Sequence, residues 1–135
     1  MSRFVLDAGA LIHLASERLG VAAGHELLAP TLVRSQTLSL VHEAVHRGEL
    51  DVDAGRDQLL RIWGMKIRYL GDAVLRGRAW EIAEKLGWPS TYDAEYVALT
   101  QLQADAFVTL NVDLRRQVQE IVRVASVEDL ADPTG

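Results

Sequence analysis

Short runs of apolar residues recur along the chain, and longer segments with a different spacing separate them. Residues 4–6, Phe-Val-Leu, form a continuous apolar run. A run of this kind predicts a strand that is buried on both faces. Residues 66–70 alternate between polar and apolar side chains, which predicts an edge strand. Further short runs predict strands at residues 26–29, 106–110 and 121–125.

Between these runs, apolar residues return every three or four positions, which is the spacing of a helix with one buried face. Asp51 or Asp53 and then Asp72 stand where helix caps are expected, and Gly87 marks a helix end. Ser90 with Asp93 resembles a capping box, although Asp replaces the usual Glu or Gln. Helices are therefore predicted around residues 10–12, 32–47, 59–63, 72–86, 92–103 and 114–118.

Strands that alternate with helices predict an α/β fold with right-handed crossovers and a mainly parallel sheet. No internal repeat, low-complexity run or linker interrupts the 135 residues, so one domain over residues 1–135 is expected. Ligands of such sheets gather beyond the carboxyl ends of the strands. The residues just after each strand are therefore the first candidates for chemistry.

The composition narrows the class of protein. The chain is 49% hydrophobic and 24% charged, as expected of a folded domain, and it has no apolar stretch long enough to span a membrane. It contains no cysteine, which excludes disulfides and thiolate metal sites, and Asp7 comes too early for a secretory signal. A cytoplasmic location without a membrane partner is expected.

The charge also bears on nucleic-acid binding. The formal net charge of −5 argues against a general nucleic-acid coat protein, because such proteins gain affinity by neutralising phosphates. Cationic residues concentrate between residues 56 and 85, however. This stretch fits either a local basic surface beside an acidic site or ordinary solvated helix faces.

Several polar side chains follow directly after the predicted strands or lie in the helices next to them. Asp7 follows the first strand, Asp93 falls in the first turn of a helix, and Asn111 and Asp113 follow the strand at 106–110. Glu43 falls on the polar side of the helix at 32–47. Two like charges about 4 Å apart cost about 4 kcal/mol at an effective dielectric of 20. A hard dication such as Mg²⁺ removes that cost, activates a bound water and stabilises charge on a phosphodiester.

Each of these residues also has a plain structural interpretation. Asp7 and Asp93 are suitable helix caps, and Glu43 is a typical solvated helix residue. Asn111 and Asp113 fit a strand-to-helix turn. Composition and spacing leave both interpretations open.

Three segments of the chain resemble motifs of the PIN-domain family. Residues 4–11, FVLDAGAL, resemble its opening strand and first acid, and residues 91–100, TYDAEYVALT, resemble its "YDA.Y.AL" helix. Residues 104–111, ADAFVTLN, resemble the strand that ends in Thr-x-Asp or Thr-x-Asn, and Glu43 matches the internal acid. The order and spacing of the motifs extend over essentially the whole chain.

The resemblance implies a three-layer α/β/α fold with a mainly parallel sheet of about five strands. It also implies endoribonuclease activity that depends on Mg²⁺ or Mn²⁺, with Asp7, Glu43 and Asp93 as catalytic acids and metal ligands. Many members have Thr-x-Asp where this chain has Asn111, which brings no charge, and Asp113 is the nearest acid that can take its place.

The length most closely resembles that of a VapC-type toxin from a prokaryotic toxin–antitoxin pair. The resemblance then implies an RNA substrate, a VapB-type antitoxin whose tail reaches the acidic site, and frequent formation of homodimers.

Two other functions compete with this interpretation. Residues 42–46 read His-Glu-Ala-Val-His, the pattern in which zinc proteases hold Zn²⁺ with His42 and His46 while Glu43 activates water. No histidine follows His46, so a distant Asp or Glu would have to be the third ligand. The other alternative is a PIN-like domain that binds RNA or a partner without cutting it.

Overall fold

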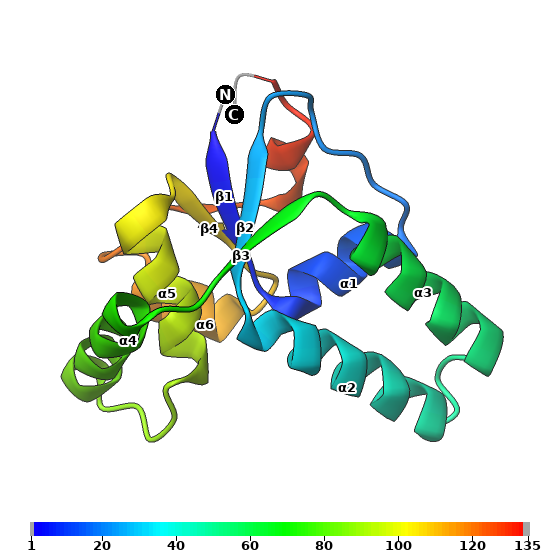
Figure 1. Ribbon diagram of the computed structural model, residues 1–135, viewed down its shortest axis with the longest axis horizontal. Coiled ribbons are helices and arrows are strands. Elements are labelled where there is room, and N and C mark those ends of the chain that lie inside the picture. Colours follow the sequence, from blue (N-terminus) through cyan, green and yellow to red (C-terminus); the bar gives the residue numbers. More distant parts are fainter. Residues whose placement is uncertain (1, 134–135) are drawn as a thin grey trace.

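Five parallel strands form one sheet in a computed structural model that describes residues 2–133 (Figure 1). The order of the strands across the sheet is β3-β2-β1-β4-β5, and every neighbouring pair is parallel. The strands are β1 (Arg3–Leu6), β2 (Glu26–Pro30), β3 (Ile67–Leu70), β4 (Ala106–Val108) and β5 (Val124–Ala125). The predicted α/β class with a parallel sheet is confirmed.

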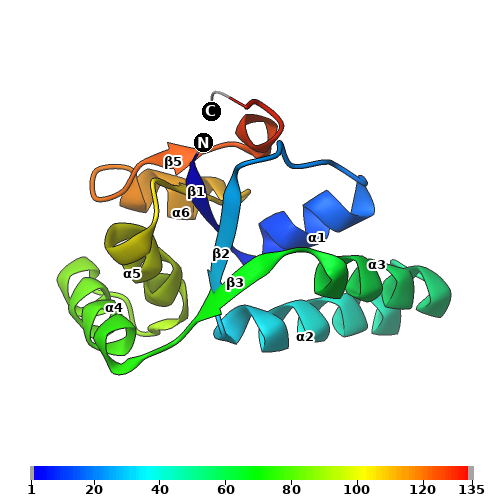
Figure 2. The same cartoon turned by 45° about the horizontal axis from the view of Figure 1, so that its top comes forward.

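Helices lie on both sides of this sheet, as the three-layer prediction requires. The helices are α1 (Ala8–Ser16), α2 (Leu32–His46), α3 (Val52–Gly64), α4 (Ala73–Leu86), α5 (Tyr92–Gln103) and α6 (Val112–Val118), and a 3₁₀ turn, η1, spans Val127–Leu130. Helices α1, α2 and α3 pack together, whereas α4 packs on α5 and α5 contacts β1, β2 and β4 (Figures 1 and 2). Among residues 2–133, no helix is long and apolar enough to cross a membrane.

The burial of the strands follows the apolar runs in the sequence. Phe4 and Val5 of β1 and every residue of β4 are fully buried, because helices cover both faces of these central strands. Strand β3 lies at an edge and is only half-buried on its apolar side. Burial of one large apolar side chain contributes about 1.5–3 kcal/mol, so substitution of Phe107 by Ala would remove a major part of the core.

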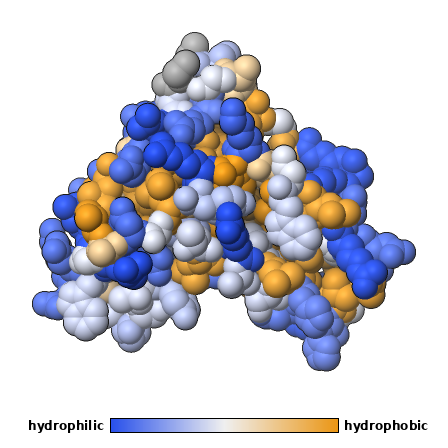
Figure 3. All heavy atoms as spheres, in the orientation of Figure 1, coloured by the Kyte–Doolittle hydropathy of each residue, from blue (hydrophilic) through white to orange (hydrophobic). Residues whose placement is uncertain are grey.

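The strand order reverses at the centre of the sheet. After β1 the chain builds β2 and β3 on one side, and it then returns to build β4 and β5 on the other. Carboxyl ends of parallel strands share one edge, so Asp7, after β1, and Thr109, after β4, both lie at this switch point. Figure 3 shows that the surface is hollowed at the same lower edge, between the α4–α5 side and the α2 side. In open α/β sheets this is the place where ligands bind.

The predicted capping box at the start of α5 is wrong. Helix α5 begins after Thr91 without a side-chain cap, and the Ser90 hydroxyl instead accepts a hydrogen bond from the Tyr92 N–H at 3.3 Å. The Asp93 carboxylate is therefore not part of a helix cap. At the start of α3, the cap is Asp51 rather than Asp53.

The apolar spacing predicts that Leu60, Ile62 and Trp63 lie on the buried side of α3, and Val74, Leu75, Trp80 and Ile82 on that of α4, and this prediction is partly wrong. Leu60 and Trp63 are 64% and 56% exposed, although Ile62 is buried as expected. On α4, Val74 and Trp80 are likewise exposed while Leu75 and Ile82 are buried. Both helices pack mainly on other helices, which cover a narrower stripe than a sheet does.

Candidate active site

Asp7 is fixed at the switch point by hydrogen bonds from two different elements. Its Oδ1 accepts from the Ala10 N–H at 2.9 Å, so the residue caps α1. Its Oδ2 accepts from the hydroxyl of buried Thr109 at 2.5 Å. The same Thr109 oxygen accepts from the Asn111 N–H at 3.1 Å. The predicted cap is confirmed, and the carboxylate is also held in one orientation beside the end of β4.

Asp93 lies within electrostatic range of Asp7. Burial raises the pKa of Asp7 and the negative charge of Asp93 raises it further, against the opposing effect of the hydrogen bonds from Thr109 and Ala10. Burial also raises the pKa of Asp93. None of the ion pairs within residues 2–133 includes either carboxylate. The edge therefore holds two acids whose negative charge no nearby cation offsets.

Tyr96 connects these acids to α2. Its side chain is buried, its ring stacks on Phe107 at 6.2 Å between centroids, and its hydroxyl donates to Gln36 Oε1. Burial and the negative charges of Asp7, Asp93 and Glu95 raise the pKa of Tyr96. The phenol therefore stays protonated and acts as a hydrogen-bond donor to Gln36.

A pocket of about 470 Å³ opens at this edge beside Asp93. It is lined by Gln36, Trp88, Pro89, Ser90, Tyr92, Asp93, Asn111, Asp113, Leu114 and Gln117. Three of the predicted site residues thus line one pocket, although they come from α5 and from the start of α6.

Asn111 and Asp113 also serve the local structure. Asn111 Oδ1 accepts from the Leu114 N–H at 3.1 Å and caps α6, which confirms the strand-to-helix turn. Exposed Asp113 pairs with Arg116 at 3.0 Å. Its charge is therefore partly offset, unlike that of Asp7 or Asp93.

Glu43 lies outside this group. It is exposed on α2, where its carboxylate accepts from the Ser39 hydroxyl at 2.7 Å and lies 3.9 Å from Arg47. Within residues 2–133, no three or more His, Cys, Asp or Glu side chains are grouped so that they could hold a metal ion. The predicted gathering of Asp7, Glu43 and Asp93 is therefore not formed.

The predicted zinc arrangement also lacks its third ligand. His42 and His46 are both exposed on α2. Because no three or more His, Cys, Asp or Glu side chains within residues 2–133 are grouped so that they could hold a metal ion, neither histidine has the other ligands that a zinc site needs.

The sequence reasoning missed Gln36 and Glu95. Gln36 shares the polar face of α2 with Glu43 but lies seven residues nearer its start, about 10 Å along the helix axis. Gln36 was missed because the candidates were chosen among carboxylates, and Gln36 carries an amide. The one sequence signal that could have found it is its position on the polar face of this helix. Glu95 lies within the segment 91–100, and burial raises its pKa while the charge of Arg76 opposes the rise.

Neither a protein-family model nor a curated protein matches this chain. Its fold is similar to that in the crystal structure of PAE2754 from Pyrobaculum aerophilum, with a TM-score of 0.71. The match covers 95% of this chain and 91% of that chain at 20% sequence identity. At this level of identity the likeness concerns the fold.

Proposed function

We propose that this chain is a divalent-metal-dependent endoribonuclease of the PIN-domain type, which hydrolyses an RNA phosphodiester at the edge that holds Asp7 and Asp93. The observation that carries the proposal is the pair of unpaired acids at the switch point, each with a raised pKa. Acids with perturbed pKa values in a hollow are typical of functional sites. The resemblance of residues 4–11, 91–100 and 104–111 to PIN motifs supports the same choice.

The donor set fits one Mg²⁺ or Mn²⁺ ion. Asp7 and Asp93 supply two hard carboxylate donors, and their mutual repulsion is the cost that a dication would remove. Mg²⁺ commonly binds through one or two carboxylates and keeps several waters, which leaves positions for a substrate phosphate. When bound, the ion supplies an activated water and stabilises charge on the phosphodiester.

The protein's own residues hold this site in shape. Thr109 orients the Asp7 carboxylate, and the hydrogen bond between Tyr96 and Gln36 joins α5 to α2. Asp93 stands in the first turn of α5, where the positive end of the helix dipole favours its charge. Asn111 connects to Asp7 through its N–H bond to Thr109.

Cleavage of single-stranded RNA by the purified protein, with Mg²⁺, Mn²⁺ or EDTA, tests the proposal. Cleavage should need the metal and should fall roughly 100-fold or more in Asp7→Asn and in Asp93→Asn. Asp53→Asn is the matched control, because exposed Asp53 also lies in the first turn of a helix. Cleavage that persists in EDTA or in both site variants would contradict the proposal.

One observation favours a second candidate, a PIN-like domain that binds RNA without cutting it. Three polar residues that line the pocket, Gln36, Asn111 and Gln117, are amides, and Asp113 pairs with Arg116, so only two unpaired carboxylates, Asp7 and Asp93, remain at the site. Binding of RNA by the wild-type protein without metal-stimulated turnover would favour this candidate over the nuclease.

We extend the proposal to a VapC-type toxin that forms a homodimer and is silenced by a VapB-type antitoxin, on the strength of the resemblance. Expression should arrest growth, and Asp7→Ala or co-expression of the product of an abutting upstream reading frame should relieve the arrest. Light scattering of the purified chain measures the oligomeric state. Normal growth on expression of the wild-type chain would contradict the toxin assignment without affecting the nuclease proposal.

A further inference from the structure

Three amide side chains line the pocket beside Asp93, and the carbonyl oxygen of each is already in use. Gln36 Oε1 accepts from the Tyr96 hydroxyl, Asn111 Oδ1 from the Leu114 N–H, and Gln117 Oε1 from the Trp88 indole N–H at 2.7 Å. A side-chain amide has one oxygen acceptor and one NH₂ group with two donors. Within residues 2–133 none of these NH₂ groups donates to a protein acceptor, so each of the three lining residues keeps donors that are available to a ligand.

Aromatic surface lies beside these donors. The Tyr92 side chain, at the start of α5, is 56% exposed. Trp88 is half-buried, and its bond to Gln117 fixes the ring. RNA-binding proteins stack unpaired bases on aromatic rings and read the base edges by hydrogen bonds. A pocket of about 470 Å³ is within the size range of small-molecule sites.

The charges of the pocket argue for a neutral group rather than a phosphate. Its described lining includes no Lys, Arg or His, and it includes the carboxylates Asp93 and Asp113. A phosphate inside the pocket would meet like charge, because no cationic side chain lines the pocket to offset it. A flat, uncharged ring with hydrogen-bond acceptors fits the donors and the aromatic surface together.

We propose that this pocket binds one unpaired RNA base next to the scissile phosphate and selects bases that carry a carbonyl oxygen. Guanine, uracil and cytosine have such oxygens, whereas adenine has only ring-nitrogen acceptors, and the exocyclic NH₂ group beside two of them would meet the amide donors of the pocket. The carbonyl oxygen accepts up to two hydrogen bonds from the amide donors of Gln36, Asn111 and Gln117, and Tyr92 stacks on the ring. This inference rests on the proposed nuclease function and names the feature of RNA that its site selects.

Competition binding in EDTA, where a metal-dependent enzyme does not cut, measures the selectivity. The competitors are four-nucleotide RNAs with three abasic positions and one base, together with a fully abasic RNA, against a labelled single-stranded RNA. Guanine, uracil or cytosine should improve competition about tenfold over adenine, since a good base contact is worth about that factor. The fully abasic RNA should compete least.

Substitutions that exchange donors for acceptors identify the residues. Gln117→Glu keeps an oxygen for Trp88 but removes the NH₂ group of Gln117, so the selectivity should fall. Gln119→Glu adds the same charge near the same helix but outside the pocket lining, and it should keep the selectivity. Tyr92→Ala should weaken binding of every base about tenfold, whereas Trp80→Ala, which removes an exposed aromatic on α4, should not.

The results distinguish this inference from the proposal on which it rests. Equal competition by adenine, abasic and carbonyl-bearing RNAs would overturn the base subsite, and so would equal effects of Gln117→Glu and Gln119→Glu. Metal-dependent cleavage that needs Asp7 and Asp93 would then still support the nuclease. Absence of both binding and cleavage in the wild-type protein would overturn both.

Discussion

The two edges of the sheet differ in how their charges are arranged. The edge where the strands begin has the larger pocket, about 940 Å³, whereas the pocket at the strand ends is about 470 Å³. At the larger pocket, Glu26 pairs with Arg3 at 3.1 Å and with Arg68 at 3.5 Å. At the other edge, Asp7 and Asp93 have no such partners within residues 2–133.

This difference indicates that unpaired charge, rather than the size of a hollow, marks the candidate active site. Glu26 is offset by two cations, so its charge serves the structure. Asp7 instead lies beside a second acid, and the fold holds it there with Thr109 and Ala10. A folded protein keeps such an arrangement at a cost in stability, which is typical of functional sites.

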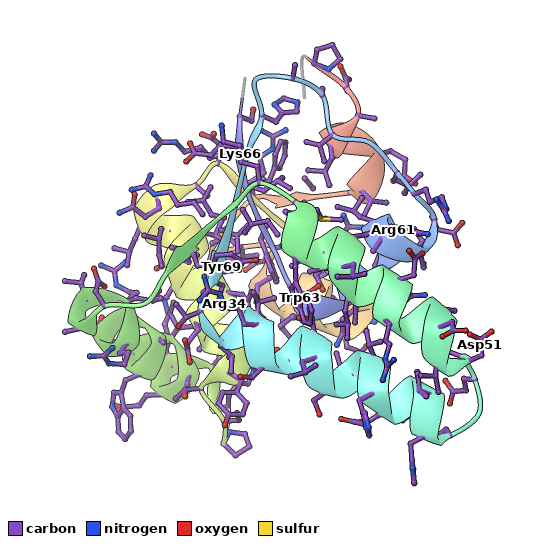
Figure 4. The ribbon with its side chains drawn as sticks, turned by 45° about the vertical axis from the view of Figure 1, so that its right-hand side comes forward. Arg34, Asp51, Arg61, Trp63, Lys66 and Tyr69 are labelled. Atoms are coloured by element: carbon purple, nitrogen blue, oxygen red, sulfur yellow. The ribbon has the colours of Figure 1, made fainter. Side chains whose placement is uncertain are left out.

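Three of the seven cations of the segment 56–85, Arg61, Arg68 and Arg78, form ion pairs within residues 2–133. Arg61 donates to the Ala15 carbonyl at 2.7 Å and pairs with Asp57, and Arg78 lies 3.7 Å from Glu81. Figure 4 shows that Arg61 and Lys66 lie on different parts of the surface. The same view shows Arg34, outside this segment, beside Tyr69, with 4.2 Å from its guanidinium carbon to the ring centre. The structure thus distributes these cations over several elements.

Removal of the Thr109 hydroxyl should have a large effect on the strand-end edge, although smaller than that of Asp7→Asn or Asp93→Asn. Thr109→Val deletes the hydrogen bond that lowers the pKa of Asp7, so that pKa should rise further. We expect a 10- to 100-fold loss of cleavage, as for other residues that orient metal ligands. The acidic limb of the pH–rate profile should also move to higher pH.

Thr37→Val is the matched control, because the hydroxyl of buried Thr37 donates to the Val33 carbonyl of its own helix. Loss of activity with an unmoved pH profile, or an equal loss in both variants, would show that Thr109 has only a packing role.

Replacement of Gln36 by an acid should increase the unpaired negative charge at the edge where the strands end. Gln36→Glu keeps an acceptor for Tyr96 and places a third carboxylate near Asp93. We expect the affinity for Mn²⁺, measured by calorimetry, to rise roughly three- to tenfold, because cation sites are tuned by their number of charged ligands. Glu43→Gln should leave the affinity for Mn²⁺ unchanged, since Glu43 is exposed on α2 outside the pocket. An affinity that falls in Glu43→Gln and does not rise in Gln36→Glu would instead support the sequence prediction that Glu43 is a metal ligand.

Neutralisation of Asp7 should stabilise the metal-free fold. The pKa of Asp7 is raised above 3.8, so the folded state loses stability as the pH rises from about 3.8 through the raised value. Asn remains a good helix cap, so Asp7→Asn should raise Tm at pH 7 by about 2–4 °C. The gain should shrink as the pH falls toward 4, and it should also shrink when Mg²⁺ stabilises the wild type. A lower Tm in the variant would contradict the idea of a strained acid pair.

Loss of the Glu26 charge at the opposite edge should have the smallest effect. Glu26→Gln removes two exposed ion pairs, each worth less than about 1 kcal/mol. Urea denaturation should show a correspondingly small loss in the free energy of unfolding, and cleavage should not change. A large loss of cleavage would mean that the two edges are functionally coupled.

The sequence by itself determined where the five strands and six helices of residues 2–133 lie, although β4 and β5 are shorter than the predicted 106–110 and 121–125 and the turn η1 was not predicted. The apolar run at residues 4–6 and the Gly87 stop predicted β1 and the end of α4, because strand burial and the left-handed backbone of Gly87, with φ at 68°, are local requirements. The sequence also indicated Asp7 and Asp93 as candidate site residues, since each stands next to a predicted end of a strand or helix.

Only the tertiary structure decided which side chains meet. The order of the strands places β4 beside β1 and so brings Thr109 to Asp7 across 102 positions of sequence. Helical periodicity placed Gln36 and Glu43 on the same polar face of α2, but it could not choose between them. That choice depends on where α2 crosses the edge of the sheet, which is set by packing between distant segments rather than by any local pattern.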